Sequence, residues 1–127
     1  MMLAASVYHL PPRVLPAIHA VEGGAPGQVR RDADGSEDFG PMQVNSLWLG
    51  RIAARAGMSR RATRQRLIDD PCFNIAAAAL ILRIDIERDG GDLLQAVGDY
   101  HSKTPDLHRS YLRRVEAAAR RLFGHRR

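Results

Sequence analysis

The chain has 127 residues, of which 45% are hydrophobic and 26% are charged, which is the length and balance of one globular domain (1–127) with a core of its own. No apolar run approaches the roughly 18 residues of a membrane-spanning helix, so the sequence excludes an integral membrane protein. The net charge of +5 comes from 18 arginines and one lysine, a balance that favours a polyanionic partner without identifying it.

The first nine residues lack the basic start of a secretory signal peptide, and His9 and Pro11 interrupt their apolar run. We therefore expect no cleavable leader within this chain. Cys72 is the only cysteine, so an internal disulfide is impossible, and we expect this thiol to be buried and inert.

An apolar helix is predicted to end at Glu22. Val14, Ile18 and Val21 recur at steps of four and three, which places them on one face of a helix entered through two prolines. Gly23 and the glycine after it are ordinary helix stop signals. A glutamate at such a position is usually solvated, so Glu22 gains its interest only from the residues that follow.

Residues 23–38 contain glycine, proline and aspartate without hydrophobic periodicity, which indicates a long loop with room for a short hairpin. Its acidic residues suggest a calcium loop, but Gly35 comes two positions too early for an EF-hand and the closing glutamate is missing. We therefore predict no metal and no cofactor.

The second half of the sequence predicts helices around one core. One begins at Asn45 or Ser46 and ends at Gly57, another runs from Ser59 to Ile68, and a long one opens at 70–71 and ends at 90–91. Their predicted buried residues are Trp48, Ile52 and Ala56 in the first, and Ile75, Ala79, Leu82 and Ile86 in the third.

Asp92 is predicted to cap a shorter helix that ends at Val97, followed by a loop over 98–105. A last helix begins near Asp106, and its expected buried residues are Leu107, Tyr111, Val115, Ala118 and Leu122. The tail 125–127 is basic. With little strand signal, the fold class should be mainly α.

Three sequence blocks occur together in one order. The first, 12–24, reads PRVLPAIHAVEGG; the second, 34–49, reads DGSEDFGPMQVNSLWL; the third runs from DPCFN at 70–74 to YHSKTP at 100–105. From about Leu10 to Tyr111 the chain resembles the lytic transglycosylases (SLT domain) of the lysozyme-like superfamily. The resemblance is greatest to the small murein-cleaving proteins that accompany conjugation and type III or type IV secretion machines.

The resemblance implies a mainly α, lysozyme-like fold with a long loop after the catalytic helix. It implies cleavage of the β-1,4 bond between N-acetylmuramic acid and N-acetylglucosamine, with Glu22 as general acid and then base, so that 1,6-anhydro ends form. Such a glutamate must keep its proton near neutral pH, which requires an apolar setting that raises its pKa. Ile18, Val21 and Met42 could supply that setting.

By the same resemblance, Gln43 and the backbone of Gly40 to Met42 line the sugar site, and Tyr100 bonds near the catalytic carboxylate. Pro41 stands where the family often has another apolar residue, which removes one backbone donor. The supporting residues are Asp38, Asn45, Asp99, His101 and Ser102, of which Asn45 should cap the following helix. The two aspartates are more typical of turns or caps than of a second catalytic carboxylate.

The implied partners are peptidoglycan strands and components of a secretion or conjugation machine, in the periplasm or cell envelope, and the implied alternative reaction is hydrolysis by a true lysozyme. A rival interpretation rests on residues 52–67, where a helix, a glycine turn and an arginine-rich helix are typical of a DNA-reading helix-turn-helix. This motif leaves the blocks at 40–45 and 100–105 unexplained, so nucleic acid is the less favoured partner. A non-catalytic murein-binding module is a third, weaker reading.

Overall fold

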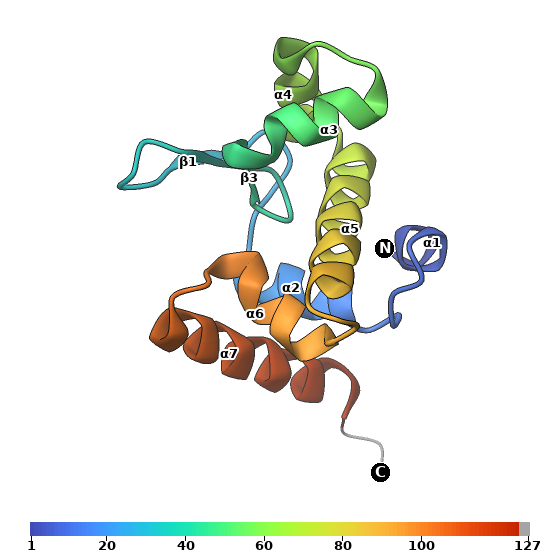
Figure 1. Cartoon of the computed structure of the whole chain (residues 1–127), viewed down its shortest axis with the longest axis vertical. Helices are drawn as coiled ribbons and strands as arrows, with labels where there is room; N and C mark the ends of the chain where they lie inside the picture. Colours follow the sequence, from blue (N-terminus) through green and yellow to red (C-terminus); the bar gives the residue numbers. More distant parts are fainter. Residues whose placement is uncertain (125–127) are drawn as a thin grey trace. The chain divides into compact units, whose positions relative to one another are not determined.

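The structure is a computed structural model that describes residues 1–124 (Figure 1). Its elements in chain order are α1 (Met2–Val7), α2 (Val14–Glu22), β1 (Val29–Arg31), β2 (Glu37–Phe39), β3 (Val44–Asn45), the 3-10 helix η1 (Ser46–Trp48), α3 (Leu49–Ala56), α4 (Arg60–Asp69), α5 (Pro71–Arg88), α6 (Leu93–His101) and α7 (Pro105–Phe123). Helices dominate, so the mainly α fold class is confirmed. Among the described residues, no helix combines the length and hydropathy needed to cross a bilayer.

The chain divides into two compact units. The first comprises Met1–Val21 and Ala79–Arg127, and the second comprises Glu22–Ala78. Each is described separately below, and the expectation of one domain over 1–127 stays a prediction.

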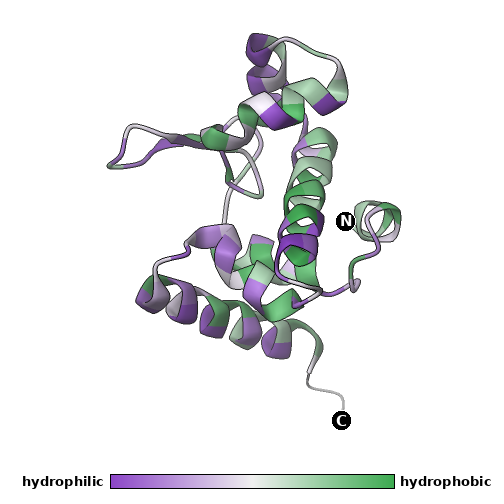
Figure 2. Cartoon of the chain, in the orientation of Figure 1, coloured by the Kyte–Doolittle hydropathy of each residue, from purple (hydrophilic) through white to green (hydrophobic). Residues whose placement is uncertain are grey.

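In the first unit, α6 and α7 pack against each other (Figure 1). Figure 2 shows α7 with hydrophilic and hydrophobic residues interleaved along its turns, and its buried residues follow at steps of three and four: His108, Tyr111, Val115 and Ala118. The predicted stripe is wrong at both ends, because Leu107 is 52% exposed and Leu122 is 42% exposed. The buried position in the first turn belongs to His108, one residue along the helix.

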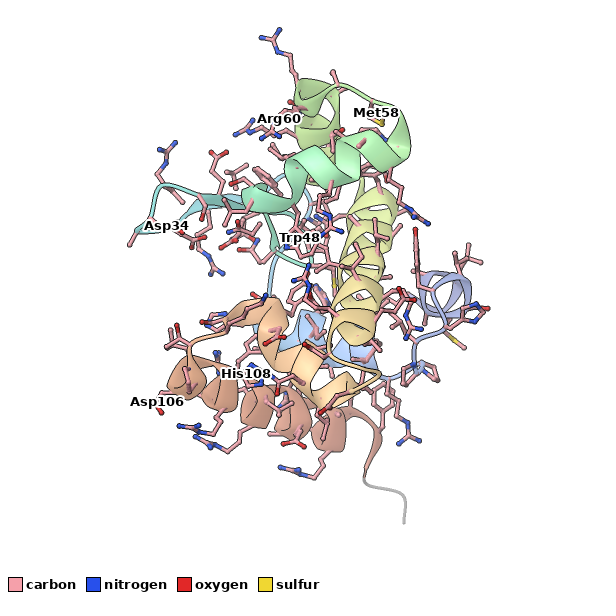
Figure 3. The ribbon with its side chains drawn as sticks, in the orientation of Figure 1. Asp34, Trp48, Met58, Arg60, Asp106 and His108 are labelled. Carbon is pink, nitrogen blue, oxygen red and sulfur yellow. The ribbon has the colours of Figure 1, made fainter. Side chains whose placement is uncertain are left out.

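Helix α6 extends four residues beyond the predicted end at Val97, so the predicted loop over 98–105 is largely wrong. Gly98 allows this extension because a Cβ added there would lie 2.1 Å from His108 Cε1. The imidazole projects from α7 toward α6 (Figure 3). Asp92 caps α6 as predicted, since its carboxylate accepts a hydrogen bond from the Gln95 amide at 3.0 Å.

A buried carboxylate occupies the end of α5 that belongs to the first unit. Asp85 is 3% exposed, with Arg88 Nη1 at 3.6 Å from its Oδ1. Burial is the main cause that raises the pKa of Asp85 to about 6, while Arg88 acts in the opposite direction. Between about pH 4 and pH 6, Asp85 therefore keeps its proton in the folded protein, whereas it has released this proton in the unfolded chain.

Asp85→Asn is expected to stabilise the protein at neutral pH and not at pH 4. The stability linked to the raised pKa is fully present below the unfolded value and is lost as the pH rises through about 6, so the asparagine variant should gain roughly 1 to 3 kcal/mol at pH 7.5. Urea unfolding at both pH values measures the difference. Glu87→Gln, at an exposed position of the same helix, is the matched control. An equal gain at pH 4 would contradict the explanation.

In the second unit, three antiparallel strands form a sheet in the order β1-β2-β3. Val29, Arg30 and Arg31 of β1 pair with Phe39, Asp38 and Glu37 of β2, which confirms the short hairpin predicted within 23–38. The Asp32 amide donates to the Ser36 carbonyl at 2.8 Å to close the turn, and Asp34 lies at its tip (Figure 3).

The helix predicted from residue 45 or 46 begins as the 3-10 helix η1, and this changes which side chains are buried. A 3-10 turn advances by three residues per turn instead of 3.6, so Trp48 is out of phase with α3. Trp48 is only half-buried and Ala56 is exposed, contrary to prediction, while Leu49, Ile52 and Ala53 are buried. Gly57, at φ 67°, ends α3, and Ser59 caps α4, both as predicted.

Helix α5 carries the predicted apolar stripe with one difference at its start. Ala79, Leu82 and Ile86 are buried, whereas Ile75 is half-buried. Cys72 is exposed, so the expectation of a buried thiol is wrong. It lies in the first turn of the helix, one residue after Pro71, where the side chain faces outward.

Candidate active site

Glu22 is the last residue of α2, as the sequence predicted. Gly23 follows with φ 65°, a left-handed conformation that glycine adopts without strain and that commonly ends helices. The Glu22 side chain is 11% exposed, and Arg30 Nη2 of β1 lies 3.9 Å from its Oε1. The carboxylate is therefore recessed, with the Arg30 guanidinium beside it.

Gly24 packs directly on the turn formed by residues 40–43. A Cβ added at Gly24 would lie 2.1 Å from the Gly40 carbonyl oxygen and 2.8 Å from the Pro41 carbonyl oxygen, so no other residue fits without moving the backbone. The sequence suggested only a helix stop at this position. The structure shows that Gly24 joins the segment carrying Glu22 to the second sequence block.

The turn 40–43 is tightly built and strained at Gln43. The Gln43 amide donates to the Gly40 carbonyl at 3.1 Å, and Gln43 Nε2 donates to the same oxygen at 2.9 Å. Gln43 adopts φ 50°, which is unfavourable for a residue with a side chain and is often found at functional sites. Its Oε1 is buried and accepts no hydrogen bond from residues 1–124.

Asn74, the last residue of the DPCFN segment, holds this turn from α5. Its Oδ1 accepts a hydrogen bond from the Met42 amide at 2.9 Å, and its Nδ2 donates to the carbonyls of Phe39 at 2.8 Å and Leu67 at 2.9 Å. Asn74 is 0% exposed. No role was predicted for Asn74 from the sequence, although an asparagine inside an apolar helical stretch is a signal for a buried hydrogen-bonding residue.

Asp38 and Asn45 belong to a polar network beside the hairpin turn. Asn45 Nδ2 donates to Asp38 Oδ1 at 2.9 Å and to Ser36 Oγ at 3.1 Å, while Asn45 Oδ1 accepts from the Leu47 amide at 2.9 Å and caps η1, as predicted. Burial, followed by a hydrogen bond shared with Asp32, raises the pKa of Asp38 to about 6. This network orders the hairpin, while the hydrogen bond from Asn45 acts against the rise in the pKa of Asp38.

The acidic residues of the hairpin form hydrogen bonds within the chain. Ser36 Oγ bonds Asp34 Oδ1 at 2.6 Å, and the Ser36 amide bonds the same oxygen at 2.9 Å. These hydrogen bonds are the main cause that lowers the pKa of Asp34. Within residues 1–124, no group of three or more histidine, cysteine, aspartate or glutamate side chains is arranged to hold a metal ion.

The remaining candidate residues, Tyr100, Asp99, His101 and Ser102, belong to the first unit and lie at the end of α6. Asp99 Oδ1 is 3.2 Å from His108 Nδ1, and the carboxylate is 5% exposed. Burial and the nearby Asp89 raise the pKa of Asp99. His101 instead stacks on Tyr111, with ring centroids 4.8 Å apart, and Ser102 Oγ accepts from the Thr104 amide. His108, whose contact with Asp99 sequence reasoning missed, belongs to the same unit.

The structure therefore brings Glu22, Gly40, Met42, Gln43, Asp38 and Asn45 into one compact unit. Arg30 also belongs to this group, but its contact with Glu22 was not predicted from the sequence. A strand of three exposed residues has no hydrophobic periodicity that would indicate which residues lie beside it. Gly24 and Asn74, also missed, hold the group together.

Comparison with known proteins identifies the family. The transglycosylase SLT domain matches residues 2–122. Invasion protein IagB of Salmonella typhimurium, strains SL1344 and LT2, is 30% identical over 126 residues, which cover 95% of this chain and 75% of that protein. Invasion protein IagB of Salmonella typhi is 30% identical over 124 residues, which cover 94% of this chain and 74% of that protein.

The SLT family consists of lytic transglycosylases, which act on peptidoglycan, and its lysozyme-like fold is the class expected from the sequence. The three sequence blocks, the helical architecture and a match over nearly the whole chain agree. This chain belongs to the transglycosylase SLT domain family.

Proposed function

We propose that this protein is a peptidoglycan lytic transglycosylase whose catalytic acid and base is Glu22. The observation that carries the proposal is the recessed Glu22 carboxylate, 11% exposed, on a segment that packs through Gly24 against the turn 40–43. A carboxylate removed from water and held by rigid neighbours suits proton transfer in a defined direction.

In the proposed reaction, Glu22 donates its proton to the glycosidic oxygen while the bond from that oxygen to muramic C1 breaks. The resulting carboxylate then removes the proton of the muramic C6 hydroxyl. The C6 oxygen forms a bond to C1, which closes the 1,6-anhydro ring and returns the proton to Glu22. No water is consumed, and one glutamate is sufficient because the substrate supplies the nucleophile.

The turn 40–43 is proposed to contact the sugar through acceptors. The Gly40 amide donates to the Gln28 carbonyl, the Met42 amide donates to Asn74, and Pro41 has no N–H. The backbone donors of this turn are therefore already used. Gln43 Oε1, buried and without an N–H partner among the described residues, is the group best suited to accept a hydrogen bond from a sugar hydroxyl or acetamido group.

We propose the periplasm or cell envelope as the place of action, where the enzyme would open murein locally for a secretion or conjugation machine. The support is the similarity to proteins named invasion proteins in Salmonella and the sequence resemblance to transglycosylases of such machines. An export test with a periplasmic reporter fused to the natural gene product would examine the compartment.

Hydrolysis is a second candidate because Asp38, a partly buried carboxylate with a pKa of about 6, lies in the same unit as Glu22. A glycosidase of the two-carboxylate type needs a second carboxyl group to position water or form a covalent intermediate. The bonding of Asp38 to Asn45 favours a structural role, so transglycosylation remains the preferred reaction.

Mass analysis of digested murein is expected to separate the two reactions. The main products should be about 18 mass units lighter than unreduced reducing-end muropeptides, or about 20 lighter than reduced ones, because no water is added across the bond. Asp38→Asn and Asp99→Asn should keep most of the turnover, because neither carboxylate is needed when the substrate supplies the nucleophile. Reducing ends as the main product, with loss of activity in either variant, would show that water is the nucleophile.

The structure has the two packed helices of a helix-turn-helix, but the arginines that would contact DNA are bonded within the protein. Helices α3 and α4 do pack together around Gly57. However, Arg64 donates to both oxygens of Glu37, at 3.2 and 3.1 Å, and Arg66 bonds Asp70 at 2.8 Å. Two arginines that would have to reach base edges are used within the protein, so DNA reading is not proposed.

A further inference from the structure

Arg30 places a cation beside the proposed catalytic carboxylate, and this cation is loosely held. Its Nη2 lies 3.9 Å from Glu22 Oε1, well beyond the roughly 2.7 to 3.2 Å of an N–H···O hydrogen bond. The Arg30 side chain is 53% exposed, whereas Glu22 is 11% exposed. Within residues 1–124, no hydrogen bond of the Arg30 guanidinium is found, so its donors remain available for another acceptor.

The strand β1 places its two arginines on opposite faces, because successive side chains of a strand alternate. Arg31 lies 3.8 Å from Glu37, which also accepts two hydrogen bonds from Arg64. Arg30 lies on the other face, paired across the strands with Asp38, and its charge acts on the Asp38 carboxylate. Arg30 therefore stands on the side of the candidate catalytic group, and Arg31 does not.

A guanidinium is well suited to bind a free carboxylate with two parallel hydrogen bonds. Peptidoglycan carries such carboxylates on the stem peptides attached to muramic acid, next to the bond that is cleaved. We infer that Arg30 is a specificity residue that binds a stem-peptide carboxylate, an inference that rests on the function proposed above. Because Arg30 is exposed, substrate can reach it, and its long contact with Glu22 is easily replaced by a contact with a substrate carboxylate.

This exchange couples recognition to catalysis. A cation close to a carboxylate favours its deprotonated form, and Glu22 must carry a proton to start the reaction. When a stem-peptide carboxylate binds Arg30, the charge beside Glu22 is neutralised and the protonated acid is favoured. A strand whose stem-peptide carboxylates are amidated leaves Arg30 beside Glu22, so strands with free carboxylates are cleaved in preference to amidated ones.

The test compares wild type, Arg30→Gln, Arg30→Lys and the matched control Arg31→Gln on two substrates: murein strands with free stem-peptide carboxylates, and the same strands with those carboxylates converted to amides. For Arg30→Gln, kcat/KM on strands with free carboxylates should fall about tenfold, the size of one charge-assisted contact. Its activity on amidated strands should not fall, and the falling basic limb of its pH profile should move to higher pH, because no cation then favours the deprotonated Glu22. Arg30→Lys should lie between, and Arg31→Gln should match wild type.

A binding experiment keeps this inference separable from the proposed function. Calorimetry with a disaccharide tripeptide, and with the same compound after amidation of its carboxylates, should show a preference for the former in wild type and Arg31→Gln, and none in Arg30→Gln. If this binding preference is observed but neither substrate is cleaved, the proposed function would be wrong, while Arg30 would still be supported as the carboxylate-binding residue. An Arg30→Gln variant that keeps the wild-type preference in binding and in turnover would overturn the inference.

Discussion

Glu22→Gln is expected to abolish murein cleavage, with kcat reduced by roughly a hundredfold to ten-thousandfold, which is the range of a lost general acid. The amide keeps the shape of the side chain but can neither donate the proton to the glycosidic oxygen nor remove one from the C6 hydroxyl. Muropeptide analysis of purified sacculi measures the loss. The melting temperature should stay close to that of the wild type, because the amide fills the same space and can still take part in hydrogen bonds.

Glu87→Gln is the control for this experiment, since it makes the same chemical change at an exposed position of α5. It should retain full activity and stability. A Glu22→Gln variant with more than about a tenth of wild-type kcat would contradict the assigned role. An unfolded variant would be recognised by its circular dichroism, and Glu22→Asp, which keeps the charge but shortens the side chain, would then serve as the second test of proton transfer.

Asn74→Ala is expected to cause the largest loss of stability, about 3 to 5 kcal/mol, because it removes side-chain hydrogen bonds to three buried backbone groups. These are the Met42 amide and the carbonyls of Phe39 and Leu67. A loss of that size is a large part of the roughly 5 to 15 kcal/mol that stabilises a typical domain. Urea unfolding measures it directly.

Thr63→Val provides the matched control, because Thr63 is also 0% exposed but makes one side-chain hydrogen bond, to the Ser59 carbonyl at 2.8 Å. Its expected cost is about 1 kcal/mol. At temperatures where Asn74→Ala is still folded, murein binding should weaken as well, since the turn 40–43 loses its attachment to α5. Equal stability losses in the two variants would show that Asn74 is not the support described here.

The sequence by itself determined the mainly α fold, the helix that ends at Glu22 and the caps at Ser59 and Asp92. These features depend on local chemistry: the spacing of apolar residues, a carboxylate or hydroxyl before a first turn, and a glycine after a last turn. The order of the three blocks around Glu22, 40–45 and 100–105 also determined the family, which the comparisons confirmed.

Only the tertiary structure decided which residues surround the candidate site. Nothing in the sequence around Gly98 predicts that an imidazole ten residues later will cover it and let α6 continue to His101. In the same way, Asn74 reaches the turn 40–43 across more than thirty residues, and Arg30 meets Glu22 only because the hairpin brings it there. The physical reason is that helix propensity and capping are set by residues within one or two turns, whereas hydrogen bonds and ion pairs between distant segments depend on packing.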